Sequence, residues 1–299
     1  MENDAVRSME QMEPAVSVVM IIRNVEKYIS KSIKSILNQT FANFEVVVID
    51  DFSSDLTGTI IKRFNDKRIR YFKNEKWLGI SKSRNKSVKF ARAKYLFFTD
   101  GDCTVSKTWI EEGFQYFKNP NCLGVEGSIY YVSKDYEPTF SDHVMENRFG
   151  GYFMTGNIAY TKKAINTVGG FDERLTYFED RDIALRIKKN GKIFFNPEMM
   201  VFHQRTVLTP KEYVKRATSV KNRVHLFKKY GQRNSLMWRI LFPNNILKIL
   251  VPPLILSSIF LKKFRNSEDF KLLPFVYIYV INQRLHLWKE CVKERVFLI

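Results

Sequence analysis

Cysteine and histidine are scarce in this chain, which has three cysteines and four histidines among 299 residues. Cys103, Cys122 and Cys291 form no CxxC pair, and no histidine stands beside them at the spacing of zinc ligands. The sequence therefore offers neither a disulfide framework nor a zinc site, and a reducing cytosol suits its thiols best. Residues 1–15 lack the basic segment and the apolar run of a signal peptide, so we expect the chemistry of this protein to face the cytoplasm.

Acidic residues are also few, and the deficit is concentrated in one part of the chain. The formal net charge is +18, from 49 Lys and Arg against 31 Asp and Glu. Residues 204–299 hold 19 basic and 5 acidic residues, a net of +14, which leaves +4 for residues 1–203. A hydrophobic content of 45% is ample for a core and excludes a disordered chain. The basic character belongs to the C-terminal third.

Hydrophobic periodicity predicts alternating strands and helices in the N-terminal part of the chain. Near-continuous apolar runs predict strands over 17–22, 44–51, 69–73 and 95–100. Amphipathic segments at helical spacing separate these runs, which is typical of an α/β fold with a parallel sheet covered on both faces. The later elements that the sequence predicts are a helix over 178–191, short strands over 192–197 and 199–203, and a long basic helix over 210–231.

Two apolar runs mark the C-terminal region, 240–261 with the single charge Lys248, and 272–281. A bilayer-spanning helix needs about 20 mostly apolar residues; the first run is interrupted by asparagines and a proline pair, and the second is short. Three arrangements stay open: a membrane hairpin, a re-entrant or interfacial helical pair, and core helices that cap the preceding domain. Because basic residues surround the runs, we favour attachment to an anionic cytoplasmic leaflet.

Acidic residues gather where a predicted strand ends or a predicted helix begins. They form three groups: Asp50 with Asp51, Asp100 with Asp102, and Glu179 with Asp180 and Asp182. Ligands of open α/β sheets bind at the carboxyl ends of the strands, so one crevice can collect all three groups. Two carboxylates one residue apart repel each other, and burial adds to the cost. We therefore expect a divalent cation between Asp100 and Asp102.

Each group also has a purely structural explanation. The first group, with Asp55, can cap the helix that follows it. The Asp-Gly-Asp triplet at 100–102 can form a turn, and Asp182 can pair with Arg186 one helical turn later. Together these explanations need three coincidences, so we favour a shared functional site.

Four segments carry a resemblance to a known family: VSVVMIIRN (16–24), SILNQTFANFEVVVIDDFSSDLTGTI (35–60), NEKWLGISKSRNKSVKFARAKYLFFTDGD (74–102), and 155–203 with its TGN, GGFD and FEDRD motifs. In this order they resemble a family 2 glycosyltransferase of the GT-A fold, from about Val16 to His203 and less distinctly to Gly231. The resemblance implies a Rossmann-like, nucleotide-diphospho-sugar transferase domain over 16–231. A polar tail, 1–15, precedes it, and a mostly helical, apolar and basic, membrane-associated extension, 232–299, follows it.

The resemblance implies a set of residues that bind the donor nucleotide and a metal ion. The positions of the nucleotide pocket correspond to Ile21, Asp51, Arg84 and Asp100, with Asp51 at the base and Asp100 near the ribose. Asp102 matches the ligand of a Mg2+ or Mn2+ ion that bridges the diphosphate. His203 is either a further metal ligand, a contact of the diphosphate, or a hydrogen-bonded histidine of the core.

The resemblance also implies the residues that handle the acceptor. Asp180 matches the family's general base, which takes the proton of the acceptor hydroxyl as that hydroxyl attacks the anomeric carbon in one inverting displacement. Glu179 is implied to position the acceptor or the turn. Gly156 and Asn157 match positions where the backbone comes close beneath the acceptor, although glycines near a helix start also occur in ordinary turns.

The chain departs from the family pattern in two places. Relatives usually have a proline and an aromatic residue before the asparagine of the first loop, whereas this chain has Ile21, Ile22 and Arg23. This departure leaves the identity of the base open. The QxxRW motif of processive synthases has no counterpart in the sequence, so we favour transfer of one sugar at a time.

The resemblance and the basic, apolar C-terminus together indicate a metal-dependent inverting glycosyltransferase at the cytoplasmic face of the cell membrane. The partners implied are a nucleotide-sugar donor, a hydroxyl acceptor that is polyprenyl-linked or membrane-proximal, and an anionic membrane surface. Such an enzyme serves the synthesis of a surface polysaccharide, a glycolipid or a glycan precursor.

Two alternative functions remain beside this one. A catalytically inactive scaffold would keep the fold, but the four aspartates at 51, 100, 102 and 180 are all present. A nucleic-acid binder would use the basic helix 210–230, but that helix continues into long apolar runs. We therefore expect no nucleic acid among the partners.

Overall fold

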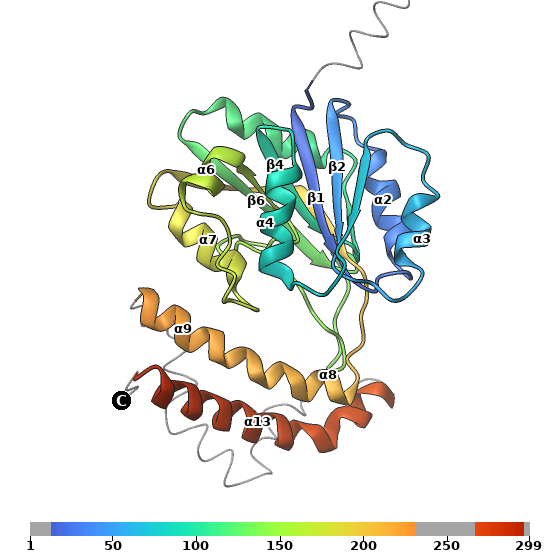
Figure 1. Ribbon diagram of the computed structural model, residues 1–299. Helices are drawn as coiled ribbons and strands as arrows, with labels where there is room; N and C mark the ends of the chain where they lie inside the picture. Colours follow the sequence, from blue (N-terminus) through green and yellow to red (C-terminus); the bar gives the residue numbers. More distant parts are fainter. Residues whose placement is uncertain (1–12, 231–266, 296–299) are drawn as a thin grey trace, which may run out of the picture. The chain divides into compact units, whose positions relative to one another are not determined.

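The computed structural model describes residues 13–230 and 267–295, and the chain divides into two compact units (Figure 1). The first, here called the sheet unit, comprises Met1–Lys134 and Met145–Gln204. The second, the helical unit, comprises Asp135–Val144 and Arg205–Ile299. The predicted ends of the polar tail and of the catalytic domain, at residues 15 and 231, stay predictions.

The described part of the sheet unit is built on one eight-stranded sheet, ordered β3-β2-β1-β4-β7-β6-β8-β5. Its strands are β1 (Val16–Ile22), β2 (Phe44–Asp50), β3 (Ile69–Lys73), β4 (Tyr95–Asp100), β5 (Cys103–Val105), β6 (Cys122–Tyr131), β7 (Ile158–Thr161) and β8 (Lys192–His203). The first four run parallel, as the sequence predicted. β7 is antiparallel to β4 and β6, and β5 is antiparallel to β8. The parallel half therefore presents the carboxyl ends of four strands at one edge.

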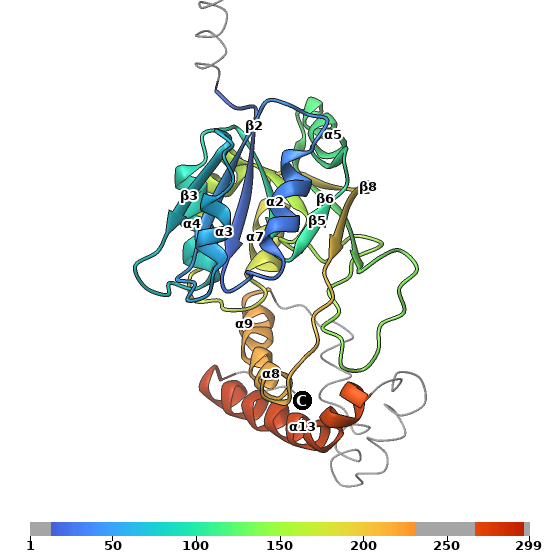
Figure 2. The same cartoon turned by 90° about the vertical axis from the view of Figure 1, so that its right-hand side faces the viewer.

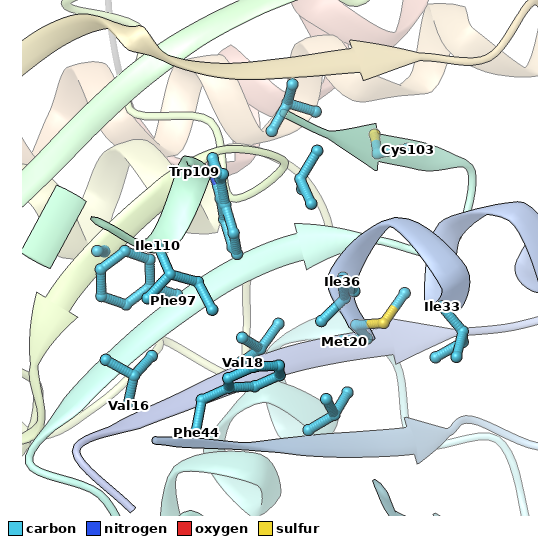
Figure 3. Packing of buried hydrophobic residues seen from close by; sticks show 14 of the residues in the cluster. Val16, Val18, Met20, Ile33, Ile36, Phe44, Phe97, Cys103, Trp109 and Ile110 are labelled. Atoms are coloured by element: carbon cyan, nitrogen blue, oxygen red, sulfur yellow. The ribbon is translucent and has the colours of Figure 1, made fainter. Parts of the chain in front are cut away.

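Helices cover both faces of the sheet, which confirms the prediction from the apolar runs. They are α2 (Ile29–Leu37), α3 (Thr57–Lys62), α4 (Ile80–Phe90), α5 (Trp109–Phe114), η1 (Gln115–Lys118), α6 (Lys162–Thr167) and α7 (Glu179–Ile187). Successive side chains of a strand point to opposite faces. In β1, Val18 and Met20 pack with Trp109 on the side of α2 and α5 (Figure 3), whereas Val19 packs with Ile183 on the side of α4, α6 and α7.

The prediction of two short strands over 192–197 and 199–203 was wrong, because β8 runs through both. Pro197, which has no N–H group, falls where the register between β6 and β8 shifts. Asn196 pairs with Gly127, and Met200 pairs with the next residue of β6, Ser128. Proline is tolerated at such an irregularity because the ladder hydrogen bond is already missing there. One long strand therefore delivers His203 to the end of the sheet.

The predicted basic helix forms in three consecutive pieces, α8 (Pro210–Lys215), the 3-10 turn η2 (Arg216–Ser219) and α9 (Val220–Tyr230). Thr209 and Glu212 form a reciprocal capping box at its start. α13 (Ser267–Lys293) packs against all three pieces (Figure 2). The contacts include Val224 with Leu287, and the rings of Tyr213 and Tyr279, whose centroids lie 4.9 Å apart.

The apolar run 272–281 lies within α13, where Leu272 and Val276 are buried. The apolar run 240–261 lies outside the described residues, as do residues 1–12 of the polar tail. Among the helices of 13–230 and 267–295, none combines the length and the apolar character that are needed to cross a membrane.

Candidate active site

Asp100 and Asp102 lie at the carboxyl edge of the parallel strands, where β4 turns into β5. Asp100 ends β4 and pairs in register with Ile21 of β1. Between the two aspartates, a Cβ atom on Gly101 would come within 2.8 Å of the Ile22 side chain, so only glycine fits without a shift. The Gly101 carbonyl accepts a hydrogen bond of 2.8 Å from the Ser32 hydroxyl of α2. The turn is thus held tightly against the first loop.

His203 is brought to Asp102 by the pairing of β5 with β8, in which Cys103 lies opposite His203. The His203 Nδ1 atom lies 2.8 Å from the carbonyl oxygen of Gln204, which can only accept, so Nδ1 carries the proton. In the neutral imidazole, the acceptor atom is then Nε2, which lies 3.4 Å from Oδ2 of Asp102. Two acceptors that face each other at this distance suit a cation between them.

A third potential ligand, the Cys103 thiol, completes a group whose ligand atoms all lie within 4.8 Å of one another. Burial raises the pKa of this thiol well above its ordinary value, and the charges of Asp102 and Asp100 raise it further. Without a metal ion beside it, the thiol therefore stays protonated. The Asp102 carboxylate is a donor that suits Mg2+ or Mn2+, whereas imidazole donors such as His203 are more typical of softer divalent metals.

Asp100 lies among the charges of several other site residues. Burial, followed by the negative charge of Asp102, raises the pKa of Asp100 to about 6, while Arg84 and His203 act in the opposite direction. A Cβ atom on Gly156 would lie 3.1 Å from Oδ2 of Asp100. The backbone at Gly156 therefore comes close to this carboxylate, while the predicted approach beneath the acceptor stays a prediction.

Arg84 of α4 and Glu179 of α7 form a buried ion pair, with side chains that are 6% and 8% exposed. The Arg84 guanidinium donates to a Glu179 carboxylate oxygen and also lies over the Phe171 ring, 5.6 Å from its centroid. The pair joins the helices that carry three of the predicted site positions, Arg84, Glu179 and Asp180. It also places a cation close to Asp100 and Asp180, since Arg84 lowers the pKa of both carboxyl groups.

Asp180 is the second residue of α7, directly after Phe178 in the left-handed conformation (φ 64°) and Glu179. Its carboxylate accepts hydrogen bonds from the backbone N–H groups of Arg181, at 2.7 Å, and of Thr155. Burial, followed by the charge of Glu179, raises the pKa of Asp180 to about 7. A carboxyl group with this pKa is poised to exchange a proton near neutral pH. Thr155 precedes Gly156, so Asp180 and Asp100 border the same stretch of backbone.

Asp51 follows β2 and fixes the loop before α4. Its carboxylate accepts from the Asn74 side chain and from the N–H groups of Leu78 and Gly79, each at 2.9 Å. Its own N–H group donates to the carbonyl of Ile22 at 2.9 Å. Three loops therefore converge on this buried residue, at the edge where Asp100 lies.

Arg23 and Trp77 flank the segments that Asp51 binds. Arg23 follows Ile22, Trp77 precedes Leu78, and the Arg23 guanidinium lies 5.3 Å from the centroid of the Trp77 ring. Trp77 is 60% exposed although its loop is held by Asp51. Trp77 was not among the predicted site residues, although a tryptophan in the polar stretch NEKWLG was a visible signal.

The Asn157 side chain is fully buried and engaged in the core, and the predicted approach of its backbone beneath the acceptor stays a prediction. Its Nδ2 atom donates to the carbonyls of Ser128 at 2.8 Å and Met199 at 2.6 Å, and its Oδ1 atom accepts from the Trp109 indole at 2.8 Å. These bonds join β6 and β8 beside Gly156.

Several of the acidic residues have the structural roles that the sequence left open. Asp50 accepts from the Tyr71 hydroxyl at 2.5 Å and from the Ser53 N–H group at 2.7 Å. Asp55 accepts from the Thr57 N–H group, and Asp182 pairs with Arg186 at 2.6 Å, one helical turn later. In the first and third acidic groups, these contacts separate the structural members from Asp51 and Asp180.

Glu126 is a further residue that the sequence analysis missed. This buried residue of β6 accepts from the Asn147 side chain at 2.8 Å and from the N–H groups of Gly151, at 2.6 Å, and Phe153. It thereby fixes the loop that leads to Thr155. A single glutamate inside the apolar run LGVEGSIYY was the available signal.

Sequence comparison identifies relatives of this chain. The pattern of the family described as Glycosyl transferase family 2 matches residues 17–179. An uncharacterized glycosyltransferase of Methanocaldococcus jannaschii, MJ1057, is 32% identical over 201 residues, 62% of this chain and 68% of the relative. An uncharacterized glycosyltransferase of Haemophilus influenzae is 37% identical over 121 residues, 40% of this chain and 38% of the relative. Escherichia coli WfaP, a UDP-Glc:alpha-D-GlcNAc-diphosphoundecaprenol beta-1,3-glucosyltransferase, is 30% identical over 172 residues, 57% of this chain and 68% of the relative.

Solved structures share the fold. The mannosyltransferase PcManGT from Pyrobaculum calidifontis, in complex with GDP-Man and Mn2+, has a TM-score of 0.64 at 15% identity, covering 93% of this chain and 88% of that chain. S. aureus TarS 1-349, in complex with UDP, has a TM-score of 0.55 at 17% identity, covering 96% and 93%. These likenesses support the Rossmann-like GT-A fold that the sheet order shows. The matched family pattern, which spans more than half of the chain, shows that this protein belongs to glycosyl transferase family 2 and is a glycosyltransferase.

Proposed function

We propose that this glycosyltransferase moves one sugar from a nucleotide-sugar donor to a hydroxyl acceptor, with inversion at the anomeric carbon and with the help of a divalent metal ion. The observation that carries the proposal is the surroundings of Asp100. Asp102, two residues away, and Arg84, His203 and Glu179, from distant parts of the sequence, all lie close enough to shift the pKa of its carboxyl group. An acidic pair, an imidazole and a guanidinium in one cluster suit a charged diphosphate and its counter-ion.

The donor nucleotide is assigned to the edge formed by β1, β2 and β4. Asp51 and Ile21 lie where the base side of the nucleotide is expected, with Trp77 beside them as a stacking surface. Asp100 is assigned to the ribose side. Arg84 adds positive charge beside Asp100, although its guanidinium is also paired with Glu179.

Asp102 and His203 are the residues that would hold Mg2+ or Mn2+, because their Oδ2 and Nε2 atoms face each other across 3.4 Å. The ion would supply positive charge to the departing nucleoside diphosphate. The hydrogen bond from His203 Nδ1–H to the Gln204 carbonyl fixes the tautomer that such a ligand needs. PcManGT, which shares the fold, was solved with Mn2+.

Asp180 is assigned as the general base. Its carboxylate accepts the proton of the acceptor hydroxyl while the hydroxyl oxygen forms a bond to the anomeric carbon. The bond from that carbon to the diphosphate oxygen breaks on the opposite side, and its electron pair leaves with the nucleoside diphosphate. The pKa of Asp180, raised to about 7, lets the carboxylate take this proton near neutral pH.

The acceptor is proposed to be lipid-linked, polyprenyl-type or membrane-proximal, at the cytoplasmic face of the membrane. WfaP and a second Escherichia coli relative, WfgD, are named as transferases to alpha-D-GlcNAc-diphosphoundecaprenol. The net charge of +14 over residues 204–299 suits an anionic membrane surface. Surface polysaccharide, glycolipid or glycan-precursor synthesis is the corresponding class of pathway.

Nucleotide binding tests the donor part of this proposal. We expect one of a panel of nucleoside diphosphates and nucleotide sugars to raise the melting temperature in the presence of Mn2+ and not in the presence of EDTA. Ligand at 100 times its dissociation constant adds about 2.7 kcal/mol of stability. The increase should be lost in Asp102→Ala. Stabilisation by no nucleotide under any condition would favour the inactive scaffold instead.

A further inference from the structure

A stripe of exposed apolar side chains runs along α13. Ile278, Leu285, Trp288 and Val292 follow one another at intervals of seven, three and four residues, which places them on one side of the helix. Their exposed fractions lie between 45% and 80%. Contiguous exposed apolar surface of this kind marks an interaction site. We call these four residues the α13 stripe.

The α13 stripe is distinct from the face that packs in the helical unit. Leu272, Val276 and Leu287 are at most 2% exposed. At 100° per residue they lie on roughly the opposite side of α13 from the stripe. That face contacts α8, η2 and α9, and Leu287 packs with Val220 and Val224. Among the described residues of the helical unit, the core therefore accounts for one apolar face of α13 and does not cover the stripe.

Basic residues border the α13 stripe on one edge. His286, Lys289 and Lys293 each follow a stripe residue by one position, so they form a neighbouring row on the helix. Lys289 and Lys293 are exposed, and Lys293 also pairs with the largely buried Glu290 at 2.9 Å. Lys221 of α9 lies close enough to lower the pKa of His286, after the larger effect of burial. Positive charge therefore gathers beside the apolar stripe.

We propose that the α13 stripe docks the helical unit on an anionic lipid bilayer, with α13 lying in the plane of the interface. The four apolar side chains would enter the boundary between headgroups and acyl chains, and the row with Lys289 and Lys293 would contact anionic headgroups. A tryptophan in the stripe fits this depth, because Trp side chains favour the interface. This inference deepens the proposed function, since it names the surface by which the enzyme meets a lipid-linked acceptor.

Trp288 provides a direct test on the full-length protein. Tryptophan emission is measured with vesicles of brominated phosphatidylcholine that contain or lack brominated phosphatidylglycerol. We expect quenching with the anionic vesicles, and we expect Trp288→Phe to lose most of it. Trp77→Phe, which removes an exposed tryptophan of the sheet unit, is the matched control and should keep the quenching.

Vesicle flotation gives the second measurement. Leu285→Ser with Trp288→Ser should lower binding to anionic vesicles by about tenfold or more, because buried apolar area drives interfacial binding. Leu56→Ser, a change at an exposed leucine of the sheet unit, should not. Lys289→Gln with Lys293→Gln should cost about fivefold per lysine on anionic vesicles and little on neutral ones.

Three outcomes would overturn the inference. Equal quenching in the parent and in Trp288→Phe would place the membrane contact elsewhere. If Trp288 is protected from a soluble quencher in the absence of lipid, another part of this chain covers the stripe. If this protection grows with protein concentration, a second copy of the protein covers it. Nucleotide binding with Mn2+ is measured on the variants of α13 and should be unchanged, so its loss would count against the proposed function or the fold rather than against the docking surface.

Discussion

The Arg84 guanidinium of α4 donates to the Glu179 carboxylate at the start of α7, and both side chains are buried. The two charges act in opposite directions on Asp180, because Glu179 raises its pKa and Arg84 lowers it. The pair therefore holds two helices together and also tunes the residue to which we assign the proton transfer. Neighbouring charges of opposite sign are a general means of setting a catalytic pKa.

Removing one partner at a time should shift the acidic limb of the pH–rate profile in opposite directions. Arg84→Gln should raise the pKa of Asp180, and Glu179→Gln should lower it, by about one pH unit each. Breaking a buried pair also costs about 3–5 kcal/mol of stability, so the profiles are recorded where both variants remain folded by circular dichroism. If the acidic limbs of the two variants move in the same direction, or do not move, the charges of Arg84 and Glu179 do not set the pKa of Asp180.

Asp180→Asn should stabilise the protein in alkaline solution. The folded pKa of Asp180, about 7, lies above its ordinary value of 3.8, so the folded state binds the proton more tightly than the unfolded state does. The ionised carboxylate therefore destabilises the folded protein, increasingly as the pH rises from about 4 to 7. We expect the variant to gain on the order of 1–4 kcal/mol at pH 8 and progressively less as the pH falls toward 4.

Urea unfolding of the parent and of Asp180→Asn at a series of pH values measures this difference. Asp182→Asn is the opposite control, because Asp182 is paired with Arg186 and its substitution should destabilise the protein. An Asp180→Asn variant less stable than the parent at pH 8 would show that the carboxylate is structural.

Trp77→Ala should weaken nucleotide binding through the base alone. Stacking of a base on an aromatic side chain contributes about 1–3 kcal/mol, so the dissociation constant should rise about tenfold. Isothermal titration with the nucleoside diphosphate and with pyrophosphate, both with Mn2+, separates the base from the phosphates. Trp77→Phe keeps an aromatic ring and should retain most of the parent's affinity for the nucleoside diphosphate. Equal weakening for pyrophosphate would assign Trp77 to the phosphates or to the fold.

Glu126→Gln should loosen the loop that leads to Thr155 and Asp180. The amide keeps one acceptor oxygen but turns an NH2 group toward backbone N–H donors, so at least one buried donor loses its partner. We expect a loss of about 2 kcal/mol of stability. The KM for the acceptor should rise while the affinity for the donor nucleotide stays near that of the parent. Glu198→Gln, at an exposed position of β8, is the matched control.

The parallel half of the sheet was predictable because its strands are buried on both faces and read as continuous apolar runs, such as VSVVMII in β1. β6 and β8 were not recognised in full. β6 contains two glycines and the buried Glu126, and β8 contains Pro197, so both depart from the local patterns of strands. Their pairing with each other supplies the stability that local propensity does not.

The places of the acidic residues at strand and helix ends were predictable, but their partners were not. Only the folded chain brings Arg84 to Glu179 and Cys103 opposite His203. The direction of a side chain was not predictable either. Asn157 is a polar residue beside Gly156, yet three hydrogen bonds hold its side chain in the core. Contacts between distant segments carry no signal in a single sequence.

The most direct test compares sugar transfer and donor binding in the parent and in Asp180→Asn, with the product anomer assigned by NMR. We predict that the variant binds the donor nucleotide as the parent does and loses transfer by about a hundredfold or more, in line with the removal of a general base. The parent should give the inverted anomer. Undiminished transfer by the variant, or a product that retains the donor configuration, would contradict the mechanism.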